Sequence, residues 1–171
     1  MIAKTVEESL IKQIQLEEQS SRIYMSMASW CEVNGFPGAA KFLYTHSDEE
    51  RMHMTKLITY LNDKGGYAVL QPLEMPAHEF KNLLDVFEQI LKHEEFVTES
   101  INKLFEVAFT QKDYTTSQFL QWYIEEQIEE ESTFKGILDK FRLAGNQTGG
   151  LFHIDKDLDT LAIPAAPAGN A

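Results

Sequence analysis

Four long amphipathic stretches dominate this chain, and each one carries polar side chains in the middle of its apolar face. Along each stretch the apolar residues recur at alternating spacings of three and four, as they do in helices that pack into a bundle. The stretches are residues 5–33, 37–64, 81–110 and 113–143. At about 1.5 Å rise per residue, each would form a helix roughly 42–46 Å long. The pattern predicts an all-α fold with four long helices.

Residues that begin or end helices separate these stretches. Thr5 followed by Glu8 predicts a capping box at the start of the first helix, and Pro37 suits the first turn of the second. Gly65 begins the break after the second helix, and Asp113 can cap the fourth. The breaks after the first and third helices are short, which predicts two antiparallel helical hairpins.

The connection between the second and third helices, residues 65–80, is far longer than a hairpin turn. In extended form, at up to about 3.3 Å per residue, it can travel the length of the bundle. We expect one long crossover here, although a functional loop or lid would show the same sequence. Residues 151–163 predict a short fifth helix, and residues 164–171, PAAPAGNA, predict a disordered tail. One domain would thus span residues 1–163.

Composition limits the classes of function. The net charge of −12 over 171 residues argues against binding to nucleic acid or to anionic membranes and leaves cations as the natural charged partners. A single cysteine, Cys31, excludes an internal disulfide framework and fits a reducing compartment. The start, MIAKTVEES, shows no signal peptide, and no apolar run approaches the roughly 20 residues that span a bilayer. We therefore expect a cytoplasmic protein.

Carboxylates interrupt the apolar face of every long helix near its middle. The interrupting residues are Glu17 in the first helix, Glu50 and His53 in the second, Glu94 in the third, and Gln127 and Glu130 in the fourth. Mid-helix positions meet at one level in an antiparallel bundle, so we expect these side chains to converge. Buried carboxylates without a positive partner would bind protons instead of staying charged.

A pair of divalent cations would neutralise this cluster, because no lysine or arginine occupies the nearby positions on these faces. Glu50 and His53, three residues apart, would present their ligand atoms on one face of a helix. Carboxylate oxygens with one imidazole suit iron or manganese better than a closed structural zinc site. The sequence predicts a two-metal carboxylate site.

Other polar residues at this level have two interpretations each. Glu49, Glu126 and Glu129 lie beside the central positions but off the apolar face, so they form either a solvated acidic face or an auxiliary cation site. Tyr24, two turns from Glu17, would either hydrogen-bond a carboxylate or take a redox or ligand-orienting role. We expect His46 to be a core histidine and His93 to be exposed; a role for His46 beside the ligands is the alternative.

These residues resemble those of the bacterial non-haem ferritins. The motifs that carry the resemblance are Glu17, the Glu50-x-x-His53 pair, Glu94 and the run QFLQWYIEEQIEEESTFKGILDKF at 118–141. The resemblance extends through FHIDKDLDTL at 152–161. It implies a ferritin-like four-helix bundle with one long crossover between the second and third helices and a short C-terminal fifth helix. It also implies a ferroxidase that oxidises Fe(II) with dioxygen or hydrogen peroxide and stores the ferric mineral in a cage of 24 identical subunits.

The resemblance implies a role for each site residue. Glu17, Glu50 and His53 would hold one iron, with Glu50 bridging to a second iron held by Glu94 and Glu130. Gln127 would lie close to that pair, and Tyr24 would donate an electron. An auxiliary third iron site would be formed by Glu49, Glu126, Glu129 and Glu130. The fifth helix would line the fourfold channels of the cage.

Three departures from related families argue against haem and against a rubrerythrin-like peroxidase. The haem-bearing bacterioferritins carry a second Glu-x-x-His, where this chain has Gln127 and Glu130. Their haem-ligating methionine would stand at Arg51, and Met52 comes one residue later, turned by about 100° on a helix. One cysteine cannot build a cysteine-rich iron site.

Two rival functions remain at this point. A di-iron oxidoreductase that acts on an organic substrate would more plausibly keep a histidine on both metals, and the central site here offers one, His53. A helical interaction bundle without metal would make Glu17→Ala or Glu94→Ala stabilising to the fold and otherwise silent.

Overall fold

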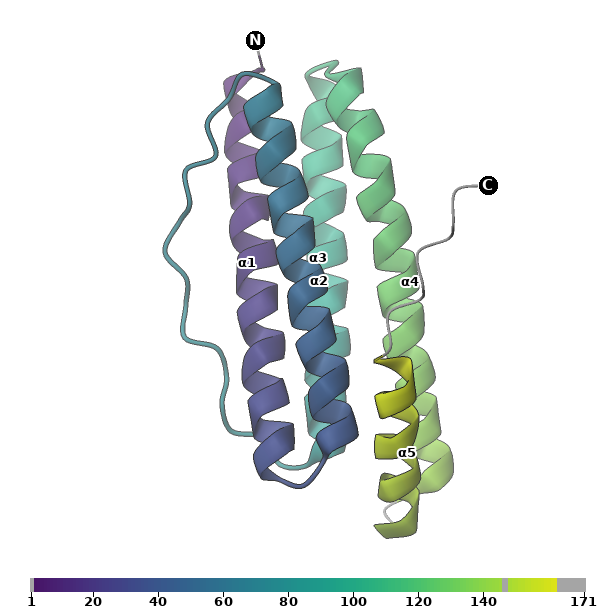
Figure 1. Ribbon diagram of the computed structural model, residues 1–171. Coiled ribbons are helices and arrows are strands. Elements are labelled where there is room, and N and C mark those ends of the chain that lie inside the picture. Colours follow the sequence, from purple (N-terminus) through teal and green to yellow (C-terminus); the bar gives the residue numbers. More distant parts are fainter. Residues whose placement is uncertain (1, 146–147, 163–171) are drawn as a thin grey trace, which may run out of the picture.

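The computed structural model of the chain describes residues 2–145 and 148–162, and within these ranges it consists of five helices and no strands (Figure 1). The helices are α1 (Lys4–Val33), α2 (Pro37–Asp63), α3 (Leu83–Thr110), α4 (Tyr114–Ala144) and α5 (Thr148–Leu161). The four long helices lie side by side, and α5 packs against α2 and α4. No helix in the described ranges is both long and apolar enough to span a membrane. The fold is the all-α four-helix bundle with a short fifth helix that the sequence predicts.

The connection from α2 to α3 runs along the bundle beside α1 (Figure 1). Side chains of α1 hold its backbone in place. Gln15 Nε2 donates to Pro72 O at 2.7 Å, and Ser26 Oγ donates to Ala77 O at 2.7 Å. Because these contacts are spread over about three turns of α1, the segment is a fixed crossover.

The start of α1 corrects a sequence prediction. Thr5 and Glu8 form no capping box, because the helix begins before them and its N-cap, Ala3, makes no side-chain hydrogen bond. The Glu7 amide donates to the Ala3 carbonyl at 3.0 Å, so the backbone alone closes the first turn. Thr5 lies inside the helix, where its side chain cannot act as a cap.

Caps and breaks set the other helix ends. Pro37 opens α2. Asn82 caps α3 by accepting a hydrogen bond from Asp85 N at 2.9 Å, and Asp113 caps α4 in the same way. The tail predicted at residues 164–171 lies outside the described residues.

The fifth helix begins at Thr148, earlier than the predicted start at residue 151. It packs on the first turn of α2, where the Ala39 amide donates to Asp155 Oδ1 at 2.8 Å. The backbones approach so closely here that a Cβ placed on Gly38 would lie 1.9 Å from Asp155 O. Glycine at position 38 therefore permits the contact between α2 and α5.

The apolar core is divided into two clusters with polar residues between them. Ile14 and Leu57 belong to one cluster, and Tyr24 and Phe134 belong to the other. Glu17 is buried on the same face of α1 between Ile14 and Tyr24. The carboxylates predicted at one level of the bundle thus lie between two apolar regions.

Candidate metal centre

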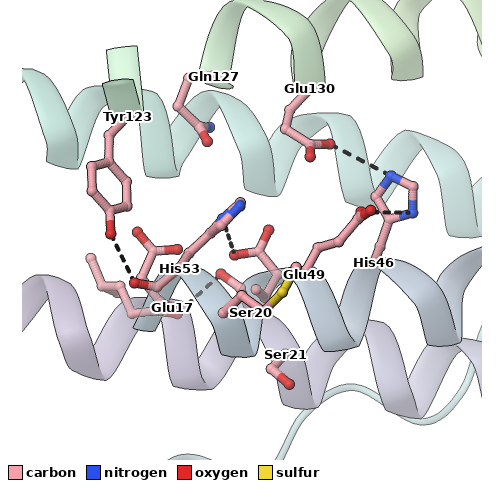
Figure 2. Close-up of polar contacts among 12 residues, drawn as sticks. Glu17, Ser20, Ser21, His46, Glu49, His53, Tyr123, Gln127 and Glu130 are labelled. Atoms are coloured by element: carbon pink, nitrogen blue, oxygen red, sulfur yellow. Dashed lines mark hydrogen bonds and ion pairs between the residues drawn. The ribbon is translucent and has the colours of Figure 1, made fainter. Parts of the chain in front are cut away.

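Side chains of α1 and α2 converge in the middle of the bundle. One ligand atom each from Glu17, Glu50 and His53 lie within 4.8 Å of one another, and all three residues are buried. His53 Nδ1 is 3.5 Å from Glu50 Oε2, and Tyr123 Oη donates to the His53 backbone oxygen at 2.8 Å (Figure 2). Glu50 and His53 share a face of α2 because they are three residues apart.

The third and fourth helices supply the other side of the centre. Glu94 is fully buried and accepts hydrogen bonds from Tyr24 Oη at 2.6 Å and from Gln127 Nε2 at 3.1 Å. Glu130 is also buried and follows Gln127 by three residues on α4. The charge of Glu94 raises the pKa of both Glu50 and Glu130, so the carboxylates of the two sides are neighbours.

Burial raises the pKa of all four central carboxyl groups. The pKa values of Glu17 and Glu50 lie well above the usual range, because burial disfavours the charged form and neighbouring carboxylates repel it. Burial and the charge of Glu94 raise the pKa of Glu130 to about 9. Burial also raises the pKa of Glu94, although the hydrogen bond from Tyr24 works against the rise. Without cations, the centre therefore holds protons at neutral pH.

Two carboxylate oxygens of the centre lack a hydrogen-bond partner. Within the described ranges, Glu50 Oε2 and Glu130 Oε2 are buried and accept no hydrogen bond. No lysine or arginine of the described residues forms an ion pair with the central carboxylates. A buried polar atom left without a partner costs about 1–3 kcal/mol. Carboxylate oxygens with one imidazole are a donor set that fits divalent iron or manganese.

A second group of possible ligands lies beside the centre. Ligand atoms of His46, Glu49 and Glu130 lie within 4.8 Å of one another, and Figure 2 shows the His46 ring facing the Glu130 carboxylate. His46 Nδ1 is 3.0 Å from Phe42 O, which can only accept, so Nδ1 carries the proton and Nε2 faces Glu130 Oε2 at 3.7 Å. Burial lowers the pKa of His46 to about 4, so the ring is neutral. His46 is thus the expected core histidine and also offers a free nitrogen to this group.

Of the three acidic residues predicted beside the centre, only Glu49 joins this group. Glu126 is half-buried and Glu129 is exposed, and neither shares a set of ligand atoms within 4.8 Å among the residues that the structure describes. Burial raises the pKa of Glu49, and the charges of Glu126 and Glu129 raise it further. The three carboxylates therefore form one acidic face next to the buried centre.

The position of His93 corrects the sequence prediction. This residue is partly buried between α1 and α3, and its Nε2 lies 2.8 Å from Ser20 Oγ. Burial lowers the pKa of His93 to about 4. The helical pattern placed His93 off the buried face of α3, but α1 covers that side as well.

Polar side chains that the sequence did not predict as part of the site hold the central carboxylates. Gln13 Nε2 donates to Glu17 Oε1 at 2.8 Å, and Ser100 Oγ donates to Gln13 Oε1 at 2.8 Å. Thr98 Oγ1 accepts from Gln127 Nε2 at 3.3 Å. The spacing of four between Gln13 and Glu17 was a signal in the sequence, whereas the contacts from α3 were not.

A scan against protein families matches residues 7–144 to the ferritin-like domain. Among curated proteins, the chain is 48% identical over 165 residues to a probable bacterial non-heme ferritin-like protein of Haemophilus influenzae, which covers 96% of this chain and 100% of the relative. It is 46% identical over 163 residues to the bacterial non-heme ferritin of Campylobacter jejuni, covering 95% of this chain and 98% of the relative.

Solved structures give the same result at the level of the fold. The open-pore ferritin of the hyperthermophilic archaeon Archaeoglobus fulgidus superimposes with a TM-score of 0.91 at 37% sequence identity. The match covers 92% of this chain and 96% of that one. A form of the A. fulgidus ferritin that was closed by site-directed mutagenesis also gives a TM-score of 0.91, at 36% identity over 93% of this chain and 97% of that one.

Proposed function

The chain belongs to the ferritin family of iron-storage proteins, and we propose that it oxidises Fe(II) at a two-metal site within each subunit and stores the Fe(III) as a mineral. In this proposal the protein is a ferroxidase, with Fe(II) as its substrate and dioxygen or hydrogen peroxide as the oxidant. The oxidised iron is its cargo.

The observation that carries the proposal is the pair of buried oxygens without a partner, Glu50 Oε2 and Glu130 Oε2. They belong to a cluster of four buried carboxylates and one imidazole that has no cationic side chain to balance it among the described residues. Divalent cations would satisfy both oxygens and allow all four carboxyl groups to ionise. In a metal-free structural bundle, nothing would offset the free-energy cost of burying these carboxylates.

Each ligand has a proposed place in the two-metal site. Glu17, Glu50 and His53 would hold one iron, and Glu50, Glu94 and Glu130 would hold the other, with Glu50 shared. Gln127 stands beside the second iron. An auxiliary cation site would draw on Glu49, Glu126, Glu129 and Glu130, and the position of His46 supports its inclusion among these ligands.

Oxygen ligands supply the chemistry that iron oxidation needs. Hard, anionic ligands favour Fe(III) over Fe(II), so each Fe(II) loses one electron to the oxidant more readily in this site than in water. Glu17, Glu50 and Glu130 have raised pKa values and hold protons in the metal-free site. Binding of Fe(II) displaces these protons. Tyr24, in hydrogen-bond contact with Glu94, is the proposed source of an additional electron.

The ligand set also suits release of the oxidised iron. Carboxylates exchange more readily than a set of imidazoles, and His53 is the one imidazole in the central cluster. A site that passes its product inward benefits from such ligands, whereas an oxygenase retains its metal. In the proposed assembly 24 subunits form the cage, and the single cysteine supports a reducing compartment such as the cytoplasm.

Stopped-flow measurement of Fe(II) oxidation at a low iron-to-protein ratio tests the site. We expect His53→Ala and Glu94→Ala to slow the rapid phase by at least about 10-fold, the scale seen when groups that hold or orient a metal are removed. Glu99→Ala is the matched control, because Glu99 is an exposed carboxylate on the same helix as Glu94. Rapid phases of wild-type rate in both site variants would refute the assignment.

A further inference from the structure

A line of hydrogen bonds connects Glu94 in the metal centre with a charged pair on the surface of α4. Gln127 Nε2 lies 3.1 Å from Glu94 Oε2 and 3.3 Å from Thr98 Oγ1. Thr98 Oγ1 donates to Glu131 Oε1 at 2.8 Å, and the other Glu131 oxygen accepts from Lys135 Nζ at 2.6 Å. The line ends in solvent, where the Lys135 side chain is 53% exposed.

The donor and the acceptor of each hydrogen bond in this line can be assigned by starting from Lys135 at the surface. An ammonium group only donates, and an ionised carboxylate only accepts. The Lys135 ammonium donates to Glu131 Oε2 at 2.6 Å, and the other oxygen of this ion-paired carboxylate accepts the single hydroxyl proton of Thr98 at 2.8 Å. The Thr98 oxygen is left as an acceptor. The group that faces it must therefore be the NH2 end of the Gln127 amide.

This orientation decides what Gln127 offers to the metal centre. With the nitrogen on Thr98 and Glu94, the amide oxygen is free to face the site, and Figure 2 shows it directed toward Glu17 and His53. An amide oxygen is a ligand or hydrogen-bond acceptor that suits a hard cation. The reversed amide would point its NH2 group at the cations and its oxygen at the Glu94 carboxylate, and both contacts would be repulsive.

We propose that Thr98 and Glu131 are positioning residues, which hold the Gln127 amide with its nitrogen on Glu94 and its oxygen toward the bound cation. This role rests on the two-metal site proposed above and adds the residues that orient one of its members. Neither residue touches the cation, and both act through Gln127. If their hydrogen bonds served only to tie α3 to α4, their loss would change stability and leave cation binding unchanged.

Binding of Co(II) alone tests the positioning role, because the visible d–d bands of Co(II) report its ligands without any oxidation reaction. Thr98→Val replaces the hydroxyl with a methyl group of similar size, and Thr98→Ser keeps the hydroxyl. We expect Thr98→Val to weaken the binding of one Co(II) ion by about 10-fold and to change its spectrum, as outer-shell changes do at metal sites. Thr98→Ser should restore both properties. Thr59→Val, the same substitution at an exposed position on α2, should change neither.

A double-mutant cycle assigns the effect to the amide. Adding Thr98→Val to Gln127→Leu should cause no further loss of Co(II) affinity, since Thr98 acts through Gln127. Additive losses, or wild-type affinity and spectrum in Thr98→Val even with a lower melting temperature, would overturn the positioning role. A wild-type chain that fails to bind about two Co(II) ions would instead overturn the two-metal site itself, and the positioning role with it.

Discussion

At the scale of single residues, the central carboxyl groups determine how the metal-free protein responds to pH. The pKa of Glu130 is about 9 in the folded chain, and an exposed glutamate has a value near 4.5. Between these values the folded state binds more protons than the unfolded state, so the free energy of unfolding falls as pH rises. This stabilisation is complete below about pH 4.5 and is lost as pH rises through about 9. Glu17, Glu50 and Glu94 act in the same direction.

We therefore expect the melting temperature of the metal-free protein to fall as the pH is raised from about 6 to about 9. Glu130→Gln should make this fall shallower, because glutamine has no proton to lose. Comparison of the two slopes by calorimetry separates the site from the general repulsion of a chain with a net charge of −12. Equal slopes in wild type and variant would contradict the assignment of a raised pKa to Glu130.

Tyr24 provides a second test at this scale. Tyr24→Phe removes the hydroxyl that donates to Glu94 at 2.6 Å and keeps the ring in its apolar cluster. We expect binding of Co(II) to persist, while Fe(II) oxidation slows and any tyrosyl radical signal in electron paramagnetic resonance disappears. Tyr44→Phe is the control, because Tyr44 also donates to a carboxylate but lies at the surface. A Tyr24→Phe protein with wild-type oxidation kinetics and an unchanged radical signal would limit Tyr24 to packing.

At the scale of elements, the contact between α2 and α5 depends on one glycine. A methyl group on Gly38 would collide with Asp155 O, and the nearby Ala39 amide would lose its hydrogen bond to Asp155. We expect Gly38→Ala to displace α5, which hydrogen exchange of the α5 amides would detect as lost protection. Gly136→Ala is the matched control, because nothing lies within 4 Å of a Cβ at this helical position. It should stabilise the protein by up to about 1 kcal/mol.

Wild-type protection of the α5 amides in Gly38→Ala would contradict this expectation, because the close approach of Asp155 O leaves no room for the added methyl group. The proposed two-metal site should bind Co(II) normally in this variant, since its proposed ligands come from α1 to α4.

Regular elements were the most predictable part of this molecule. The periodic apolar faces and the signals at Pro37 and Asp113 give the four long helices, because burial of those faces agrees with local propensity. At Thr5 a capping motif was outweighed by backbone hydrogen bonds that start the helix earlier, with Ala3 as its N-cap. The predicted start of α5 at residue 151 is too late, because Gly149 and Gly150, a residue type that disfavours helix, lie inside the helix.

The polar side chains around the centre were harder to predict than its carboxylates. Glu17 and Glu94 stand out because a charge on an apolar face violates the pattern. Thr98 and Ser100 place no charge on an apolar face, and their roles depend on which side chain of another helix lies opposite. Such contacts follow from rotation and register of the helices, which a single sequence leaves open.

At the scale of the whole molecule, the bundle places a centre of four carboxyl groups between two apolar clusters. This arrangement concentrates the cost of burying carboxylates at one level, where cations can offset it, and leaves both ends of the bundle to hydrophobic packing. The acidic face of Glu49, Glu126 and Glu129 adjoins that level and is suited to attract the same cations. Storage requires that iron passes through this centre and accumulates elsewhere.

Iron storage by this protein is tested most directly by the amount of iron retained per chain after aerobic loading with Fe(II) and desalting, beside an anaerobic control. We expect retention far above about two irons per chain, the capacity of a two-metal site, and only when an oxidant is present. Retention of about two irons per chain under both conditions would indicate an enzyme that keeps its metal, and it would contradict iron storage by this protein.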